Sequence, residues 1–282
     1  MTTPRSYVVT GASTGIGRAC VDALVNSGAH VWATVRSDTD QETLERDHPG
    51  AVTVLRLDVT DADAVRAAGE QVSAAGPING LVNNAGVALP APLEAIPIEV
   101  FRRQIEVNLI GQLAVTQVML PALRQAREQG DRARIVMVGS IGGRIATPML
   151  GAYHASKFGL VGLADTLRAE LAPSGIAVIL VEPGAIATPI WERGTQAADQ
   201  LVDQAPAGAL DRYQAQIDIA RKGAARQAKR GLPPARAAEV IVKALTADNP
   251  RPRILVGQDA HAAAIVAQLP HRLRYRLTAA RR

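Results

Sequence analysis

The sequence has 282 residues and a formal net charge of +5 at pH 7, with 48% hydrophobic and 20% charged residues. This composition is typical of a folded globular protein and excludes an intrinsically disordered one. The length suits one large α/β domain or two small ones. No run of 18 apolar residues predicts a membrane span, and no signal-peptide pattern begins the chain, so we expect a cytoplasmic protein. The single cysteine, Cys20, cannot form an internal disulfide.

The positive charge is concentrated at the carboxyl end. Seven arginines and one acid, Asp259, lie between Arg251 and Arg282, which gives this segment a charge of +6 and the rest of the chain −1. Such a basic segment indicates a nucleic acid or a membrane surface as a partner. The chain has no nucleic-acid recognition motif and no interleaved aromatic residues for base stacking, so we expect no nucleic-acid partner.

The first elements predict a dinucleotide site. Tyr7–Val9 is a short apolar run typical of a buried strand, and a helical pattern that ends near Asn26–Gly28 follows it. Between them stands Gly11-Ala12-Ser13-Thr14-Gly15-Ile16-Gly17. Glycines in such a turn let the backbone approach a pyrophosphate, whose charge is favoured at the helix N-terminus.

The end of the second strand favours a 2′-phosphate over a 2′-hydroxyl. His30–Val35 is the predicted strand, and Arg36 follows where a carboxylate would be needed to bind the ribose of NAD. A guanidinium binds a phosphate through forked, charge-assisted hydrogen bonds. We therefore predict NADP as the preferred cofactor, although Asp38, two residues on, leaves NAD possible.

Further strands are predicted at 52–57, 80–82, 134–138 and 177–181, alternating with helices. One helix is expected to begin near Asp61 with Thr60 as its N-cap, and a long one to run from Ile98 to Gln129. Asn108 lies inside this apolar helix, where an amide is costly unless bonded, so it marks a structural or a functional contact. The alternation predicts a parallel, doubly wound sheet with its ligand at the strand carboxyl ends.

Tyr153 and Lys157 lie one turn apart on a predicted helix, so their side chains share a face. A cation beside a phenol favours the phenolate, whose ordinary pKa is about 10. Such a pair can exchange a proton with an alcohol or carbonyl near neutral pH.

Taken together, these motifs resemble the short-chain dehydrogenase/reductase family over roughly residues 5 to 190. The motifs that carry the resemblance are Thr10-Gly11-x-x-x-Gly15-x-Gly17, Asn83-Asn84-Ala85-Gly86, Asn108, Ser140, Tyr153-x-x-x-Lys157 and Pro183-Gly184. The resemblance implies a single α/β, Rossmann-like domain over residues 1–282, with a mostly parallel seven-stranded sheet and helices on both faces. It also implies an NAD(P)-dependent oxidoreductase acting on alcohols or carbonyls, as a homodimer or homotetramer, with no metal.

The resemblance assigns a role to each catalytic residue. Tyr153 would exchange the proton with the substrate oxygen, and Ser140 would hold that oxygen. Lys157 would lower the pKa of the tyrosine and bind the nicotinamide ribose, and Asn108 would hold a water that relays protons to Lys157. The implied cofactor contacts are Gly11, Ser13, Thr14, Gly15, Ile16, Gly17, Arg36, Asp58, Val59, Asn84, Ala85, Gly86, Tyr153, Lys157, Pro183, Gly184, Ile186 and Thr188. Thr14 departs from the basic residue that many NADP-preferring members carry there.

The carboxyl third predicts substrate-facing elements. Residues 186–233 occupy the place of a substrate lid in the family, and helix 234–246 and strand 253–256 follow. The tail from 258 to 282 is amphipathic and basic. We expect it to be a helix packed against the lid, and the alternative is a contact with a membrane surface.

Two further stretches point to a substrate class. Arg251–Ala260 and Ala33-Thr34-Val35-Arg36 resemble the retinol and 17β-hydroxysteroid dehydrogenase-like branch, which implies a hydrophobic alcohol, ketone or aldehyde. A 3-oxoacyl-thioester or quinone reductase and a non-catalytic NADP-sensing protein are the alternatives.

Overall fold

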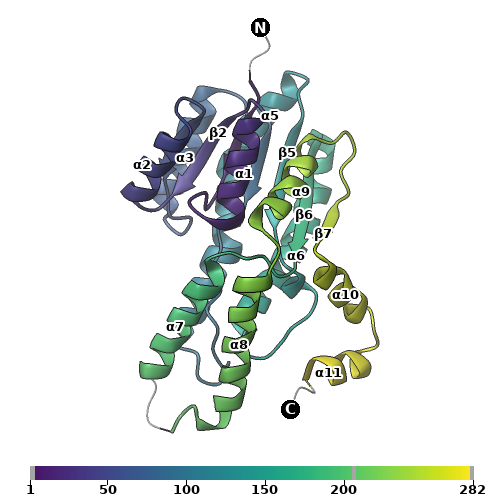
Figure 1. The fold of residues 1–282 in the computed structure, drawn as a ribbon. Coiled ribbons are helices and arrows are strands. Elements are labelled where there is room, and N and C mark those ends of the chain that lie inside the picture. Colours follow the sequence, from purple (N-terminus) through teal and green to yellow (C-terminus); the bar gives the residue numbers. More distant parts are fainter. Residues whose placement is uncertain (1–3, 205–207, 280–282) are drawn as a thin grey trace.

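The protein is described by a computed structural model, which covers residues 4–204 and 208–279. Its strands are β1 (Ser6–Val9), β2 (His30–Val35), β3 (Val52–Arg56), β4 (Gly80–Asn83), β5 (Ala133–Val138), β6 (Ile176–Pro183) and β7 (Arg253–Val256). They form one seven-stranded sheet in the order β3-β2-β1-β4-β5-β6-β7, and every neighbouring pair is parallel (Figure 1). The predicted α/β, Rossmann-like fold is confirmed, and the sheet is wholly parallel.

Helices alternate with these strands in the described part of the chain. They are α1 (Gly15–Asn26), α2 (Asp38–Asp47), α3 (Ala62–Ala75), α4 (Ile98–Ile105), α5 (Gly111–Glu128), α6 (Gly151–Leu171), α7 (Ile190–Gln204), α8 (Gln214–Arg230), α9 (Pro234–Thr246), α10 (Gln258–Ala267) and α11 (His271–Ala279). Short turns of other helix types are η1 (Glu106–Ile110, a π-helix), η2 (Ile141–Gly143), η3 (Ala172–Ser174) and η4 (Asp211–Tyr213).

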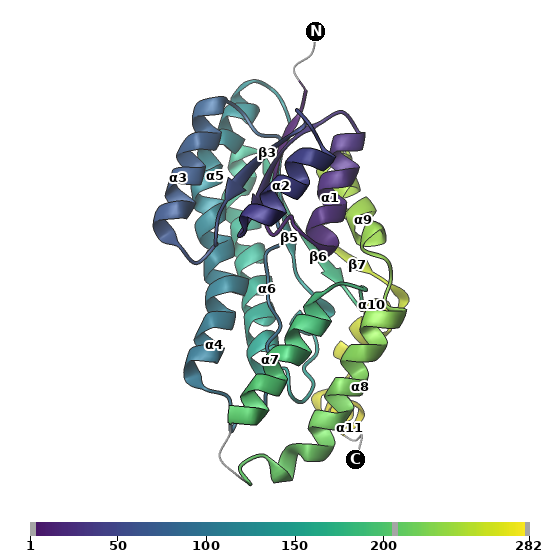
Figure 2. The same ribbon diagram turned by 60° about the vertical axis from the view of Figure 1, so that its left-hand side comes forward.

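The sheet lies between two helical layers, each with its own apolar core. α1 and α9 cover one face, and α3, α5 and α6 cover the other (Figure 2). Alternate residues of a strand point to opposite faces, so Val8 belongs to the core of the α3–α5–α6 layer, whereas Tyr7 and Val9 belong to the other. Because both faces are buried, the strands are apolar along their length.

Two helical predictions were wrong in detail. Asp61, not Thr60, is the N-cap of α3, because its carboxylate accepts hydrogen bonds from the N–H groups of Asp63 and Ala64. The predicted helix from Ile98 to Gln129 is interrupted by η1, which contains Asn108. A π-helical turn widens the helix locally and recurs at functional sites.

The segment Ile98–Glu128 has the length and hydropathy of a membrane-spanning helix. In this fold it is a core helix, because Val115, Met119 and Leu123 on α5 are completely buried against the sheet. The length and hydropathy of this segment are therefore no evidence for a membrane span.

α7 and α8 pack against each other as a helical hairpin that extends from the carboxyl edge of the sheet (Figure 1). Arg221 of α8 donates two hydrogen bonds to Asp199 of α7, at 3.0 and 2.6 Å. α7 also lies close to the chain that follows β4, since a Cβ on Gly194 would stand 2.7 Å from the Ala88 carbonyl oxygen. The hairpin is therefore held beside the carboxyl ends of the strands.

The carboxyl-terminal segment forms two helices instead of one. α10 packs mainly against β7 and η2, and α11 follows it at the far end of the molecule from the amino terminus (Figure 1). The Gly257 turn before α10 has φ +104°, a conformation that glycine adopts without strain. The expected packing of a single tail helix on the lid is thus replaced by packing of α10 on the sheet edge.

A buried carboxylate connects three elements beside the strand ends. Glu182 of β6 is completely buried and accepts hydrogen bonds from Arg144, at 2.8 Å, and Arg253 of β7, at 2.6 Å. Burial raises the pKa of the carboxyl group, but its bonds to the two guanidinium groups outweigh this and hold it below its usual value. The ion pairs fix the loop after β5 and the end of β6.

Replacing Glu182 by glutamine leaves both arginines without a counter-charge. We expect Glu182→Gln to lower the free energy of unfolding at pH 7 by about 2–4 kcal/mol, slightly below the value for a fully buried pair because the arginines reach solvent. The lowered carboxyl pKa stabilises the wild type above about pH 4.3, and this advantage is lost as the pH falls through the folded-state value. Urea unfolding at pH 7 and below pH 4 measures both effects.

The matched control is Glu239→Gln. Glu239 pairs with Arg236 at 2.6 Å, but both side chains are more than half exposed. Its loss should change the stability by less than about 0.5 kcal/mol. Equal effects of the two substitutions would contradict the role given to Glu182.

Candidate active site

The glycine-rich turn after β1 is held from both sides. Gly11 has φ +63° and donates its N–H to the Thr34 hydroxyl of β2, at 3.2 Å. Across the sheet, the Asn84 amide donates to the carbonyl oxygens of Thr10, at 2.9 Å, and of Gly11, at 3.2 Å. The Thr10 hydroxyl in turn accepts from the N–H of Asn84 and of Ala85. Asn84, predicted as a cofactor contact, therefore uses its side chain to shape the turn.

Gly17 lies in the first turn of α1, where the helix packs so closely against the preceding turn that no side chain fits. A Cβ there would stand 2.2 Å from the Gly11 carbonyl oxygen and 2.5 Å from the Asn84 amide nitrogen. Such distances forbid any residue but glycine in this backbone arrangement. With glycine at position 17, α1 therefore packs closer to the turn than it could with any other residue at that position.

The start of α1 fits a dinucleotide pyrophosphate. Thr14 is the N-cap but makes no side-chain capping bond, and no acidic residue lies in the first helical turn. The first N–H groups of a helix have no partner within it, and the helix dipole makes this end favourable for an anion. Ser13, Thr14, Gly15 and Ile16 lie at this end of the helix, and their contact with a cofactor stays a prediction.

Arg36, Asp38 and Asp58 lie at the ends of neighbouring strands β2 and β3. Arg36 is exposed and makes no hydrogen bond or ion pair within residues 4–204 and 208–279. Asp38 pairs with Arg56 at 2.5 Å. Asp58 accepts from the N–H and hydroxyl of Thr60, and these bonds together with the charge of Arg36 outweigh burial and lower its pKa. The arginine is available for a ligand, whereas both carboxylates are engaged.

Tyr153 and Lys157 lie side by side at the amino end of α6. The Lys157 ammonium stands 5.8 Å from the centre of the Tyr153 ring and donates to the Val138 carbonyl oxygen at 2.9 Å. Burial lowers the pKa of Lys157 to about 8. The predicted pair is thus brought together, with the amine fixed at the end of β5.

Ser140 completes this cluster. Burial raises the pKa of Tyr153, and hydrogen bonding with the Ser140 side chain acts in the opposite direction. The predicted lowering of this pKa by the Lys157 charge stays a prediction. The Ser140 hydroxyl oxygen accepts a hydrogen bond from the Gly142 N–H at 3.0 Å.

Asn108 is completely buried in η1, and its amide is bonded on both sides. Its oxygen accepts from the Val87 N–H at 2.8 Å, while its nitrogen donates to the Val87 carbonyl and, at 3.0 Å, to the Ser156 hydroxyl. These contacts give Asn108 a structural role in joining η1 to the chain after β4 and to α6. The predicted water-mediated relay to Lys157 stays a prediction.

The chain after β6 closes over the glycine turn. A Cβ on Gly15 would stand 3.0 Å from a methyl carbon of Thr188, so this loop touches the turn directly. Gly184 is similarly constrained, because a Cβ would meet the Asp259 carboxylate at 2.3 Å. Asp259 also accepts from the Ala185 N–H at 2.6 Å. The first turn of α10 therefore supports the loop of predicted nicotinamide contacts, Pro183, Gly184, Ile186 and Thr188.

The remaining predicted contacts lie at the same edge. Ala85 and Gly86 follow β4, and a Cβ on Gly86 would be 3.3 Å from the Asn108 oxygen. Val59 follows β3 and is buried against Gly111 at the start of α5. The structure thus gathers the predicted residues along the carboxyl edge of the sheet.

Two residues at or just before the start of α6 were missed by sequence reasoning. His154 is buried and bonds the loop after Ser140, and it occupies an unspecified position of the Tyr153-x-x-x-Lys157 motif. Met149 has φ +71°, which is uncommon for a residue with a side chain and marks strain near functional sites. No sequence signal predicts that conformation for methionine.

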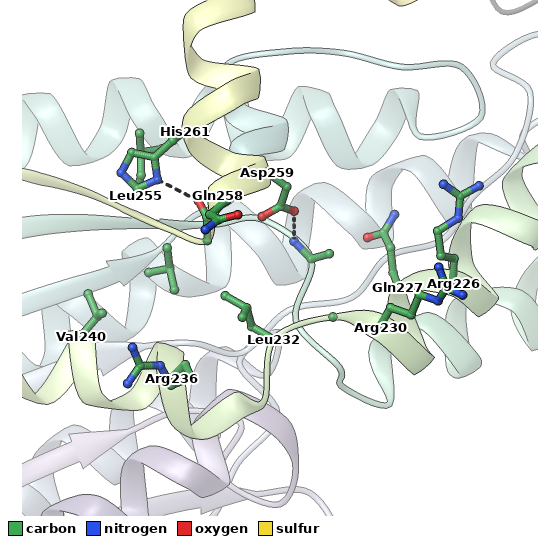
Figure 3. Close-up of a pocket in the computed structure, with 14 residues that line it drawn as sticks. Arg226, Gln227, Arg230, Leu232, Arg236, Val240, Leu255, Gln258, Asp259 and His261 are labelled. Carbon is green, nitrogen blue, oxygen red and sulfur yellow. Dashed lines mark hydrogen bonds between the residues drawn. The ribbon is translucent and has the colours of Figure 1, made fainter.

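A separate cavity of about 800 Å³ lies between α8, α9, β7 and α10 (Figure 3). Leu232 and Val240 line it together with the arginines Arg226, Arg230 and Arg236. None of the predicted catalytic or cofactor residues is among those that line it. The cavity adjoins the loop of predicted nicotinamide contacts through Ala185 and Asp259, which both line it and are hydrogen-bonded to each other.

Comparison with known proteins agrees with this geometry. A family model described as short chain dehydrogenase matches residues 5–199. The chain is 36% identical over 202 residues to the NADPH-dependent 3-dehydrocapnine reductase of Ornithobacterium rhinotracheale, covering 71% of each chain. It is 32% identical over 252 residues to human 17-beta-hydroxysteroid dehydrogenase type 1, covering 86% of this chain and 74% of that one.

Solved structures of short-chain dehydrogenases are similar to this chain as well. A short-chain dehydrogenase from Streptomyces avermitilis superposes with a TM-score of 0.78 at 29% identity, covering 94% of this chain and 92% of that one. One from Burkholderia cenocepacia J2315, in complex with NADP, superposes with a TM-score of 0.75 at 26% identity, covering 98% and 97%. The chain belongs to the short-chain dehydrogenase family, and as a member it is an NAD(P)-dependent oxidoreductase that acts on alcohol or carbonyl groups.

Proposed function

We propose that this enzyme transfers a hydride between NADP(H) and a hydrophobic alcohol, ketone or aldehyde, with Tyr153 as the general acid or base. The observation that carries the proposal is the cluster of Tyr153, Lys157 and Ser140 at the end of β5, facing the edge at which the glycine turn opens. When bound, the nicotinamide supplies the hydride chemistry, and the protein supplies orientation and the proton.

Each residue of the cluster has a definable task. Tyr153 gives its phenolic proton to a carbonyl oxygen during reduction and removes it from an alcohol during oxidation. The Ser140 hydroxyl oxygen accepts from Gly142, so its hydrogen can be donated to the Tyr153 oxygen or to the substrate oxygen. Lys157 is charged below its pKa of about 8, and this charge favours the phenolate when Tyr153 loses its proton.

A preference for NADP over NAD is supported by the strand ends. Arg36 is exposed and makes no hydrogen bond or ion pair within the described residues, whereas Asp38 is paired with Arg56 and therefore less available to a ribose 2′-hydroxyl. The relatives named above add support, since one is an NADPH-dependent reductase and one structure contains NADP.

A lipophilic substrate is supported by the similarity to a hydroxysteroid dehydrogenase over 86% of this chain and by the α7–α8 hairpin beside the site. A 3-oxoacyl-thioester is the second candidate, because a solved 3-ketoacyl-(acyl-carrier-protein) reductase from Brucella melitensis superposes with a TM-score of 0.74 at 25% identity. Quinones remain a further carbonyl class to test. A non-catalytic NADP-sensing role is disfavoured by the intact cluster.

The first test measures turnover on hydrophobic ketones and aldehydes, 3-oxoacyl thioesters and quinones. We expect the hydrophobic carbonyls to be the best substrates and Tyr153→Phe to lower kcat on them by a factor of about 10²–10⁴, because the general acid is lost. NADPH binding, followed by fluorescence, should change little.

Tyr213→Phe is the matched control. Tyr213 is a half-buried tyrosine of η4 that donates to Glu94, and its replacement should leave kcat within about twofold of the wild type. Full turnover in Tyr153→Phe would refute the mechanism, and faster turnover of thioesters or quinones would move the substrate to that class.

The second test concerns Arg36. We expect Arg36→Leu to raise the KM for NADPH by roughly ten- to a hundredfold, the value of one or two charge-assisted hydrogen bonds, and to leave the KM for NADH nearly unchanged. Arg46→Leu is the control. Arg46 is also exposed but lies near the end of α2, and its replacement should alter neither the KM for NADPH nor the KM for NADH. A wild type that uses NADH as well as NADPH would overturn the role of Arg36.

We further propose that the carboxyl-terminal helix contacts an anionic membrane surface, from which lipophilic substrates would be captured. Leu273 and Leu277, at i and i+4 of α11, are 49% and 59% exposed, and Arg272 and Arg276 are exposed next to them. Exposed leucines beside arginines are the composition of an interfacial helix.

Self-association as a homodimer or homotetramer is a second proposal, supported by the exposed apolar residues Ile110 and Phe158.

The membrane proposal is tested by flotation with vesicles. We expect the protein to bind phosphatidylcholine vesicles that contain 30% phosphatidylserine, as an order of magnitude for an anionic surface, and not pure phosphatidylcholine. The Leu273→Asp/Leu277→Asp variant should lose this binding, and the control Ile219→Asp on α8 should retain it. Binding that survives the double substitution would rule out α11. Light scattering on the purified protein without vesicles gives the oligomeric state, and a monomer would overturn the association.

A further inference from the structure

His154, the residue after Tyr153, is built into the loop that follows Ser140. Its Nδ1 lies 2.9 Å from the Gly142 carbonyl oxygen, and its Nε2 accepts a hydrogen bond from the Thr147 N–H at 3.0 Å. His154 is only 6% exposed, so both contacts are shielded from solvent. One imidazole thus spans both ends of the loop between Gly142 and Thr147.

These contacts determine which ring nitrogen carries the hydrogen. A backbone N–H can only donate and a carbonyl can only accept. Nε2 must therefore be unprotonated toward Thr147, and Nδ1 must carry the hydrogen that is donated to Gly142. The neutral Nδ1–H tautomer satisfies both bonds, whereas the imidazolium, in which both nitrogens are donors, loses the bond from the Thr147 N–H and keeps only the Thr147 hydroxyl, 3.1 Å from Nε2, as an acceptor.

The same loop residue connects the imidazole to the catalytic hydroxyl. Gly142 receives the His154 bond on its carbonyl and donates its own N–H to the Ser140 oxygen at 3.0 Å. A Cβ on Gly142 would lie 3.1 Å from His154 Nδ1 and 3.2 Å from a Tyr153 ring carbon, so its backbone is pressed against both rings. A shift of the histidine would therefore move the donor that orients Ser140.

We propose that His154 is a positioning residue for this active site, which through the Gly142 backbone fixes the Ser140 hydroxyl toward the substrate, and that only its neutral form does so. The inference rests on the proposed function, because it assumes that Ser140 and Tyr153 act on a carbonyl or alcohol oxygen. Protonation of the ring removes the acceptor for Thr147 and releases the loop, so activity falls when His154 becomes charged.

The surroundings of the ring favour the neutral form. Burial lowers the pKa of His154, and the bond to Gly142 opposes this only partly. Tyr153 lies edge-on at 6.0 Å on the same helix, Lys157 is one turn away, and Arg144 on the loop is neutralised by Glu182 of β6. The charged groups on α4, η1 and α10, the other elements beside this end of α6 and its loop, are all exposed: Glu99, Arg102, Arg103, Glu106, Asp259 and His261.

The direction of the pH effect follows. A histidine with a lowered pKa stays neutral down to below its ordinary value of about 6.5. Activity and the stability of the loop are complete above that pH, and both are lost as the pH falls through the lowered value. The wild type should therefore show an acid limb in kcat below pH 6.5.

Two substitutions separate positioning from simple packing. His154→Leu keeps an apolar side chain but removes both bonds, and should lower kcat about tenfold while the KM for NADPH stays within about twofold. His154→Asn restores an N–H near the position of Nδ1, so kcat should recover to about a third of the wild type, without the acid limb. A wild-type kcat in His154→Leu, or an unchanged acid limb in His154→Asn, would overturn the proposal.

His30→Leu is the matched control. His30 is also a partly buried histidine with a pKa lowered by burial, but it bonds Thr53 at the opposite end of the sheet from the site. Its replacement should leave both kcat and the acid limb intact. Loss of the acid limb in this variant would assign the titration to the wrong histidine and overturn the proposal.

A measurement without turnover gives an independent readout. ¹⁵N-labelled histidine resonances, with His154 identified by its loss in His154→Asn, should show the Nδ1–H tautomer and protonation below pH 6.5. An Nε2–H tautomer would refute the inference. Failure of the proposed function is distinguishable, because it appears as turnover in Tyr153→Phe, whereas an inactive Tyr153→Phe with a fully active His154→Leu refutes the His154 inference alone.

Discussion

The close approach of α1 to the turn before it is the constraint on which the rest of the site depends. Only a glycine at position 17 lets the helix start against the Gly11 carbonyl, and the Asn84 amide fills the remaining space. Because Asn84 belongs to the neighbouring strand end, the turn and the chain after β4 are set together. This contact fixes where the helix N-terminus points, and hence where a pyrophosphate can bind.

The catalytic cluster is held by a second set of bonds, from the end of β5 to α6. Lys157 is fixed on the Val138 carbonyl, and the loop after Ser140 is bonded by His154 at both ends. Glu182 ties the same loop, through Arg144, to β6. Buried hydrogen bonds are costly to break, and those of Lys157 and Glu182 are charge-assisted, so together they give this site a defined geometry.

The carboxyl-terminal third adds elements that the family model, which ends at residue 199, does not include. α10 supports the loop after β6, since Asp259 binds the Ala185 N–H and lies against Gly184. The predicted nicotinamide contacts thus depend on a residue more than 70 positions later. The same loop leads directly into α7, the first helix of the α7–α8 hairpin for which the sequence predicts a substrate lid.

The sequence by itself determined the order of strands and helices, the parallel sheet and the set of residues at its carboxyl edge, because apolar period and glycine spacing are local properties of the chain. It missed the π-helical turn at Asn108, the strained Met149 and the bonds of His154, and it placed the cap of α3 one residue early. These depend on which distant backbone groups come within hydrogen-bond reach. Only the tertiary structure decides that, since the partners Val87, Gly142 and Thr147 meet these side chains through packing and not through sequence pattern.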